Sequence, residues 1–295
     1  MVNNAYMIYI LDQAAWIADK LRKPEDAAAF RQRAQAMREA VHARYFDQGG
    51  GFYVQKEQAY FATALLACVP PDAATRKRAL DDLEHNILVT RKGHNWSGII
   101  GTYTLFKLLE QEGRDELIHT MLTRTEYPSY GYMLEQGATA IWEFWDGTAS
   151  RIHTCFTLVP WFVDSLAGIK PDPKHPGYKH FAIDPAIVGD VTWVKCAYDS
   201  VRGKIVSNWK IADGKLTMEV TVPANTTATI HVPTPDPASV MEGGQPAAKA
   251  AGVHKVKPGD GEALLDVGSG SYVFTAKAPA PRVAIPQATT SATKE

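Results

Sequence analysis

The hydrophobic pattern changes its period once along the chain, near Gly168, and this change limits the fold more than any other feature of the sequence. Before it, apolar residues recur at helical spacing, as they do between Phe30 and Tyr45. After it, apolar and polar residues alternate in short runs. A period of 3.6 and a period of 2 belong to different regular elements. We therefore predict a helical domain over residues 1–168 and a β-rich domain over residues 169–278.

The first half has the periodicity of seven helices. They are expected over residues 6–22, 24–45, 58–69, 72–88, 97–109, 114–124 and 153–166. Asp72 and Ser97 are residue types that cap helices, and they stand where the fourth and fifth begin. Some connections are short, whereas residues 92–96 and 127–132 form loops rich in aromatic residues. Paired antiparallel helices with such loops at one end indicate an α/α toroid or part of one.

The helical pattern begins almost at once. Tyr6, Ile10 and Ile17 share one stripe of the first helix, and no cap or strand precedes it. We therefore expect the chain to begin inside a longer ancestral domain.

The second half follows a linker that contains Pro171, Pro173 and Pro176, and it has the pattern of antiparallel strands. Strands are expected over residues 179–183, 192–198, 205–211, 215–222, 227–232, 263–267 and 271–276. Asp213-Gly214 is a two-residue hairpin signal. Many short strands joined by turns favour a β-sandwich, so the fold class is an α+β multidomain protein. The tail, residues 279–295, has the composition of a disordered segment.

Composition excludes several functions and selects none. The formal net charge is −1, which favours neither a nucleic acid nor an anionic membrane as partner. No stretch reaches the roughly 18 apolar residues that span a bilayer, and residues 1–9 do not form a signal peptide; the cellular location stays open. The three Cys and nine His show no metal-ligand spacing, and no phosphate loop or nucleophile elbow occurs. We predict no metal and no cofactor.

Glu143 has the most distinctive surroundings of any carboxylate in the sequence. It lies between Ile141-Trp142 and Phe144-Trp145. An apolar setting changes the chemistry of a carboxylate, and an indole face can hold the C–H face of a sugar ring. A carboxylate beside such a surface suits glycoside cleavage. The alternative, a surface Glu after an apolar run or at a helix start, is equally compatible with the local sequence.

Other side chains are weaker candidates for contacts with a sugar. His153 can bond a hydroxyl or orient Glu143, and Trp96 and Tyr130 come from aromatic loops. Each of the three is also a common structural residue. Glu135 is a second carboxylate with no special surroundings.

Several motifs then resemble one family, the bacterial α-L-rhamnosidases of glycoside hydrolase family 78. The motifs are Gly-Ile-Ile-Gly-Thr at 98–102, Tyr-Pro-Ser-Tyr-Gly-Tyr-Met-Leu at 127–134, Gly-Ala-Thr-Ala-Ile-Trp-Glu at 137–143, Pro-Gly-Tyr-Lys-His-Phe at 176–181 and Val-Pro-Ala-Asn-Thr-Thr at 222–227. The resemblance covers roughly residues 5 to 277. It implies a partial (α/α)6-barrel followed by a C-terminal β-sandwich, and inverting hydrolysis of terminal α-L-rhamnosides.

The resemblance also assigns roles to residues. Glu143 matches the general base that activates water, and His153 matches a His near the rhamnose. The resemblance also implies a rhamnose-containing glycoside or oligosaccharide as partner. Trp96, Tyr130, Trp142 and Trp145 are the expected substrate-binding side chains because of their aromatic surroundings, apart from the resemblance.

One departure limits these implications. The family's general acid lies in a Cys-Pro-Gln-Arg-Glu-Arg-like loop upstream of the base, and no such string occurs in this chain. A non-catalytic carbohydrate-binding remnant, or a structural remnant without a ligand, is therefore the alternative. A partial barrel would also leave apolar helix faces uncovered, so we expect the isolated chain to self-associate.

Overall fold

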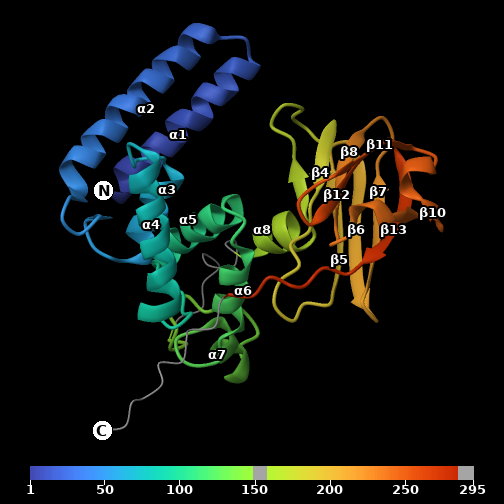
Figure 1. Cartoon of the computed structure of the whole chain (residues 1–295). Coiled ribbons are helices and arrows are strands. Elements are labelled where there is room, and N and C mark those ends of the chain that lie inside the picture. The colour runs from blue at the N-terminus through green and yellow to red at the C-terminus, as the bar shows by residue number, and fades with distance from the viewer. Residues whose placement is uncertain (149–157, 285–295) are drawn as a thin grey trace. The chain divides into compact units, whose positions relative to one another are not determined.

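The computed structural model describes residues 1–148 and 158–284, which form two compact units. Figure 1 shows helices throughout the first unit and mainly strands in the second, Leu158–Val283. The second unit begins with a short helix, α8 (Val159–Trp161), and one π-helical turn, Phe162–Leu166. The partial helical barrel and the sandwich expected from the sequence are therefore both present.

The first unit consists of helices joined mostly by short loops. They are α1 (Val2–Lys20), α2 (Pro24–Tyr45), α3 (Gln58–Leu66), α4 (Ala73–His85), α5 (Gly98–Gln111), α6 (Asp115–Thr123) and α7 (Tyr130–Glu135), with a small hairpin of β1 (Phe46–Asp47) and β2 (Phe52–Tyr53) after α2. No helix in the described part of the chain is long and apolar enough to cross a membrane.

The first two helices pack against each other as a hairpin (Figure 1). Pro24 starts α2 at a position where a missing N–H costs nothing, and two acidic residues follow it in the first turn. The predicted stripe of α2 is confirmed, because Ala34 and Val41 are buried in the core of this unit and Phe30 packs against that core.

The apolar stripe of α1, in contrast, faces outward. The helix buries a different face, which consists of Ala5, Ile8, Leu11, Ala15 and Ala18. Ile10 is 49% exposed, Ile17 48% and Leu21 63%. The alanines of the buried face let α2 approach α1 closely. This close packing explains why that face of α1, and not the stripe of larger residues, is buried.

Helix caps explain two element boundaries. Asp72 caps α4 as predicted, since its Oδ1 accepts a hydrogen bond of 2.7 Å from the N–H of Thr75. The aromatic segment from Tyr127 was predicted to be a loop, which is wrong from Tyr130 onward, where α7 begins. Ser129 precedes α7, and its Oγ accepts from the N–H of Tyr132 at 3.0 Å.

Two sheets form the sandwich. The six-stranded sheet has the order β10-β9-β13-β7-β6-β5 and the five-stranded sheet the order β11-β12-β8-β4-β3. The strands are β3 (Ile169–Pro171), β4 (His180–Ile183), β5 (Trp193–Ser200), β6 (Gly203–Ala212), β7 (Lys215–Val222), β8 (Thr227–Pro233), β9 (Met241–Glu242), β10 (Gln245–Pro246), β11 (Val253–Pro258), β12 (Glu262–Val267) and β13 (Gly270–Lys277).

The hairpin predicted at Asp213-Gly214 is confirmed: Ala212 pairs with Lys215, and both turn residues have positive φ. All the strand pairs are antiparallel except β4 with β8, which is parallel. The sequence did not indicate β3, β9, β10 or β11.

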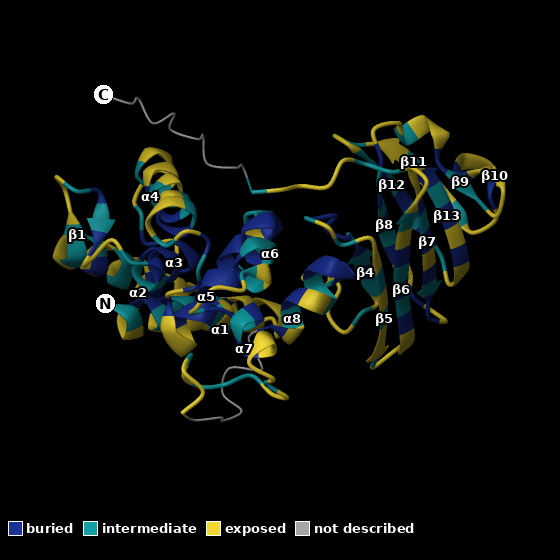
Figure 2. Cartoon of the chain, turned by 90° about the horizontal axis from the view of Figure 1, so that it is seen from below, coloured by how far each residue is buried: buried dark blue, intermediate teal, exposed yellow. Residues whose placement is uncertain are grey.

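Alternation along the strands builds the sandwich core. In β7, Leu216, Met218, Val220 and Val222 are buried as predicted, and Figure 2 shows the same alternation of buried and exposed residues along the neighbouring strands. The segment before β3 also belongs to this core. Trp209 Nε1 donates to the Leu166 carbonyl at 2.7 Å.

Candidate active site

Glu143 lines a small cavity in the helical unit. Its other walls come from the first turn of α5, from α7 and from the segment after α7, and the residues are Gly98, Ile99, Thr102, Tyr130, Met133, Trp142 and Trp145. The volume is about 60 Å³. A water molecule occupies about 30 Å³ in the liquid, so the cavity holds one or two waters and is too small for a sugar ring.

The carboxylate of Glu143 is half-buried, and its Oε2 atom is buried completely. Trp142 lies on one side of it in sequence and packs near Gly147: a Cβ at that glycine would lie 3.2 Å from the indole ring. Gly147 has a φ of 77°, so the turn depends on glycine for both its conformation and its contact. This turn fixes the segment that carries Glu143.

Trp145 and Tyr130 meet across the cavity although they are far apart in sequence. Their ring centroids are 5.2 Å apart at an interplanar angle of 72°, which is the favourable edge-to-face arrangement. The capped start of α7 positions Tyr130, and Asn95 Nδ2 donates to the Tyr130 hydroxyl at 3.4 Å. Three of the aromatic residues selected from the sequence, Trp142, Trp145 and Tyr130, are thus brought together around Glu143.

A buried polar network supports this wall, and it was not predicted from the sequence. Asn95 Nδ2 also donates to Thr102 Oγ1 at 2.9 Å, and the Ser97 hydroxyl donates to Asn95 Oδ1 at 2.5 Å. Ser97 is at the N-cap of α5 but its side chain does not cap the helix, so the predicted capping bond is wrong. The hydroxyl is held by Asn95 instead.

Gln58 at the start of α3 anchors the same loop. It is fully buried; its Oε1 accepts from the Trp96 N–H at 2.8 Å, and its Nε2 donates to the His94 carbonyl at 2.9 Å. A buried side-chain amide needs hydrogen-bond partners for both its oxygen and its nitrogen, because burial removes it from water. Such burial, however, is decided by tertiary packing, which the local sequence of Gln58 and Asn95 does not reveal.

The other predicted contacts are not gathered here. Trp96 does not line the cavity. The residue is 46% exposed, and the guanidinium carbon of Arg91 lies over its ring, 4.8 Å from the ring centroid. His153 lies outside the described residues. Asp146 is exposed and accepts from the N–H and hydroxyl of Thr148. Those bonds lower the pKa of Asp146.

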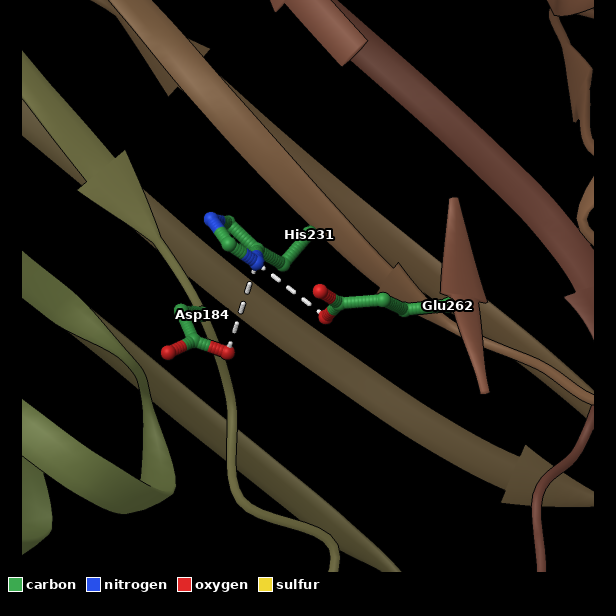
Figure 3. Close-up of side chains that lie close together, drawn as sticks. All are labelled: Asp184, His231 and Glu262. Carbon is green, nitrogen blue, oxygen red and sulfur yellow. Dashed lines mark hydrogen bonds and ion pairs between the residues drawn. The ribbon is translucent and has the colours of Figure 1, made fainter. Parts of the chain in front are cut away.

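One group of possible metal ligands occurs among the described residues, in the sandwich. Asp184, His231 and Glu262 bring one ligand atom each to within 4.8 Å of the others, and Figure 3 shows both carboxylates directed at His231 Nδ1. That nitrogen lies 3.1 Å from Glu262 Oε2 and 3.8 Å from Asp184 Oδ1.

The charges around this group favour an ion-pair cluster over a metal site. Lys170 Nζ already donates to Asp184 Oδ2 at 2.5 Å. Burial opposes protonation of His231, but the hydrogen bond to Glu262 and the charge of Asp184 outweigh it, so the pKa of His231 is raised. A protonated imidazole between two carboxylates satisfies the cluster without a cation.

Helical hairpins followed by a β-sandwich, with a carboxylate among aromatic rings, define a class of glycosidase-like proteins. Residues 1–166 match the bacterial alpha-L-rhamnosidase 6 hairpin glycosidase domain, and residues 168–246 match the bacterial alpha-L-rhamnosidase C-terminal domain. The chain belongs to the bacterial α-L-rhamnosidase family.

Similar proteins agree in fold and in name. An α-L-rhamnosidase of Streptomyces avermitilis is 29% identical over 287 residues, and the alignment covers 93% of this chain and 26% of that protein. The crystal structure of Streptomyces avermitilis α-L-rhamnosidase in complex with L-rhamnose has a TM-score of 0.82, at 28% identity and with 93% and 26% of the two chains covered. The α-L-rhamnosidase structure from Dictyoglumus thermophilum also gives 0.82, at 25% identity, covering 93% of this chain and 31% of the other. The chain thus spans between a quarter and a third of these relatives.

Proposed function

We propose that this chain contributes to the hydrolysis of terminal α-L-rhamnosides with inversion, with Glu143 as the general base. The observation that carries the proposal is the cavity in which the half-buried carboxylate of Glu143 meets Trp142, Trp145 and Tyr130. Its volume of about 60 Å³ suits one or two waters. A base that activates water needs this amount of space beside it.

The proposed step is a single displacement. Water attacks the anomeric carbon from the face opposite the leaving oxygen, while the Glu143 carboxylate takes one proton from that water. The bond from the anomeric carbon to the leaving oxygen breaks, and that oxygen takes a proton from a separate acid. The sugar ring lies outside the small cavity, and the indoles of Trp142 and Trp145 form the apolar surface next to it.

No acid for the leaving oxygen follows from this sequence, because the acidic loop of the family does not occur in it. General acid help is typically worth about 10²–10⁴-fold. We therefore expect the rate of hydrolysis by the chain alone to depend strongly on the leaving group of the rhamnoside. Aryl rhamnosides with acidic phenols should react, and alkyl rhamnosides should react far more slowly.

The test is release of L-rhamnose from 2,4-dinitrophenyl α-L-rhamnoside, whose leaving group needs no proton. Glu143→Gln should lower the rate by about 10²–10⁴-fold, because the amide cannot accept the proton of water. Glu135→Gln, in an exposed carboxylate eight positions earlier, should leave the rate unchanged. Equal rates for Glu143→Gln and the wild-type chain would overturn the role of Glu143.

The missing acid also supports a second function, that of a carbohydrate-binding remnant without turnover. Calorimetry with L-rhamnose separates the two. Binding that survives Glu143→Gln, with no release of rhamnose from the activated substrate, would favour the binding function. Absence of both binding and turnover would favour a purely structural role. Trp96 and His153 remain predicted contacts with the sugar, tested by the Trp96→Ala and His153→Ala variants in the same titration.

We also infer that the exposed face of α1 causes self-association. Four large apolar residues of this helix and the residue directly after it are between 38% and 63% exposed: Met7, Ile10, Trp16, Ile17 and Leu21. Contiguous apolar surface of this kind is characteristic of protein contacts.

A further inference from the structure

We propose a second saccharide-binding site on the outer face of the six-stranded sheet, independent of the Glu143 cavity. A groove of about 490 Å³ lies there, lined by Trp193, Lys195, Asn208, Lys210, Thr217 and Glu219. This volume is within the range of small-ligand pockets, about 300–1,000 Å³. All six residues belong to β5, β6 and β7 within one compact unit.

Strand register places the six side chains on one surface. Trp193 pairs with Lys210, which pairs with Thr217; in the next row, Lys195 pairs with Asn208, which pairs with Glu219. Residues directly opposite in antiparallel strands point to the same side. The inward positions of the same strands, such as Ile205 and Met218, are fully buried. The two rows therefore form an outward patch of roughly 10 by 7 Å.

Trp193 is the unusual member of the patch. It is 61% exposed, more than any other of the seven tryptophans, although Trp is highly buried on average. Among the described residues no second ring or cation packs on it. An open indole face is the surface on which the C–H face of a sugar ring stacks.

The neighbours of Trp193 include polar groups that the sheet holds in place. Asn208 Nδ2 donates to Glu219 Oε2 at 3.3 Å, and Asn208 Oδ1 accepts from the Cys196 N–H at 3.1 Å. These bonds hold the amide and the carboxylate in place, one row away from the indole. A ring stacked on Trp193 would present its hydroxyls to this row.

Charge selects the kind of saccharide. Lys195 and Lys210 flank the groove, and neither forms an ion pair within the described part of the chain. Glu219 is the single acidic residue among the residues that line the groove. With the two lysines, the net charge of the patch is +1. A carboxylate-bearing sugar complements it, and the ligand class is therefore an oligosaccharide that contains a uronic acid.

A protein partner fits the patch less well. The centres of protein interfaces are depleted in Lys and Glu, and here Lys210, Lys195 and Glu219 lie around the exposed Trp193. The patch is also far below the roughly 800 Å² that each partner contributes to a standard interface.

Calorimetric titration of the full chain with a tetramer of galacturonic acid and with its neutral methyl ester tests the proposal. The acid should bind at least about tenfold more tightly than the ester. Trp193→Ala should weaken both by tenfold or more, since it removes the stacking surface. Lys195→Met combined with Lys210→Met should remove the preference for the acid. Trp16→Ala, which removes an exposed indole from α1, is the matched control and should leave the affinities for the acid and the ester unchanged.

Several results would overturn the proposal. They are absence of binding to galacturonic and glucuronic acid tetramers at millimolar concentration, binding that Trp193→Ala leaves unchanged, and equal affinity for acid and ester. Conversion of a dimer to a monomer by Trp193→Ala, without any saccharide effect, would assign the face to contacts between copies. Glu143→Gln should bind the tetramer as the wild-type chain does, which separates this site from the rhamnosidase proposal.

Discussion

The two units of this chain differ in how completely they cover their own apolar surface. The sandwich encloses one core that includes Phe181, Leu216 and Phe274, all fully buried. In the helical unit, α1 buries its alanine-rich face and exposes Ile10 and Ile17. The period of a hydrophobic pattern therefore indicates whether a segment is a helix or a strand. How many of its apolar faces are buried depends on how many other elements pack against it.

The largest expected effect is in the sandwich core. Phe274→Ala should lower the free energy of unfolding by about 3–5 kcal/mol, because a fully buried ring leaves a cavity. Native-state hydrogen exchange should show the loss of protection in β6 and β7 and not in α1. Val273→Ala, next in sequence on the exposed side of β13, should cost less than about 0.5 kcal/mol. Equal loss of protection in both units would contradict the expectation that the cost is confined to the sandwich core.

A smaller effect is expected beside the candidate active site. Asn95→Ala removes its hydrogen bonds to the buried Thr102 and Ser97 hydroxyls, which keep the bond to each other and the bond from Thr102 to the Gly98 carbonyl. Losing several buried hydrogen bonds should cost about 1–3 kcal/mol. Urea unfolding measures this, with Asn3→Ala, in an exposed position of α1, as control. A cost equal to that of the control would show that the network does not support the wall of the cavity.

The exposed face of α1 predicts association of moderate strength. Sedimentation velocity should show that the wild-type chain self-associates with increasing concentration, and Ile17→Glu should weaken this at least about tenfold, or 1.4 kcal/mol. Gln32→Glu adds the same charge at an exposed position of α2 and should have no effect. A monodisperse wild-type monomer at every concentration would refute the inference.

The smallest effect is the pH dependence of the sandwich. The folded pKa of His231 is raised. The contribution of this His to the free energy of unfolding is therefore fully present below the unfolded pKa of about 6.5, and it is lost as the pH rises through the folded pKa. Burial raises the pKa of the Asp184 carboxyl, but the positive charges of Lys170 and His231 lower this pKa by more than burial raises it. The folded pKa of Asp184 is therefore lowered. The contribution of Asp184 is present above the unfolded value of about 3.9 and is lost as the pH falls.

His231→Gln should flatten the decline of sandwich stability on the alkaline side. His254→Gln, an exposed His on β11, which β12 separates from the strand of His231, should leave the decline intact. Thermal unfolding over a pH series measures both. An unchanged profile for His231→Gln would remove the imidazole from the ion-pair cluster.

Local sequence was sufficient wherever one element determined the outcome. The cap at Asp72, the hairpin at Asp213-Gly214 and the buried face of β7 follow from residue type and spacing alone. The exposed stripe of α1 and the short helix α7 do not, because competing packing and a single side-chain cap decided them. Strands such as β9 and β10 are two residues long and carry no periodicity.

The site divides in the same way. Glu143 and its neighbouring indoles were recognisable in the sequence because they are adjacent. Gln58, Asn95 and the first turn of α5 were not assigned to the site, since only the tertiary fold brings α3, α5 and α7 to one loop. The motif at 98–102 lies in the first turns of a helix predicted from the sequence, but its place beside Glu143 depends on long-range packing.

Azide rescue tests the role of Glu143 most directly. Glu143→Ala removes the base, and azide can attack the anomeric carbon without losing a proton. With 2,4-dinitrophenyl α-L-rhamnoside, the variant should be inactive in water alone, and added azide should restore dinitrophenol release with formation of β-L-rhamnosyl azide. No rescue by azide, or an azide product that keeps the α configuration, would contradict an inverting site with Glu143 as its general base.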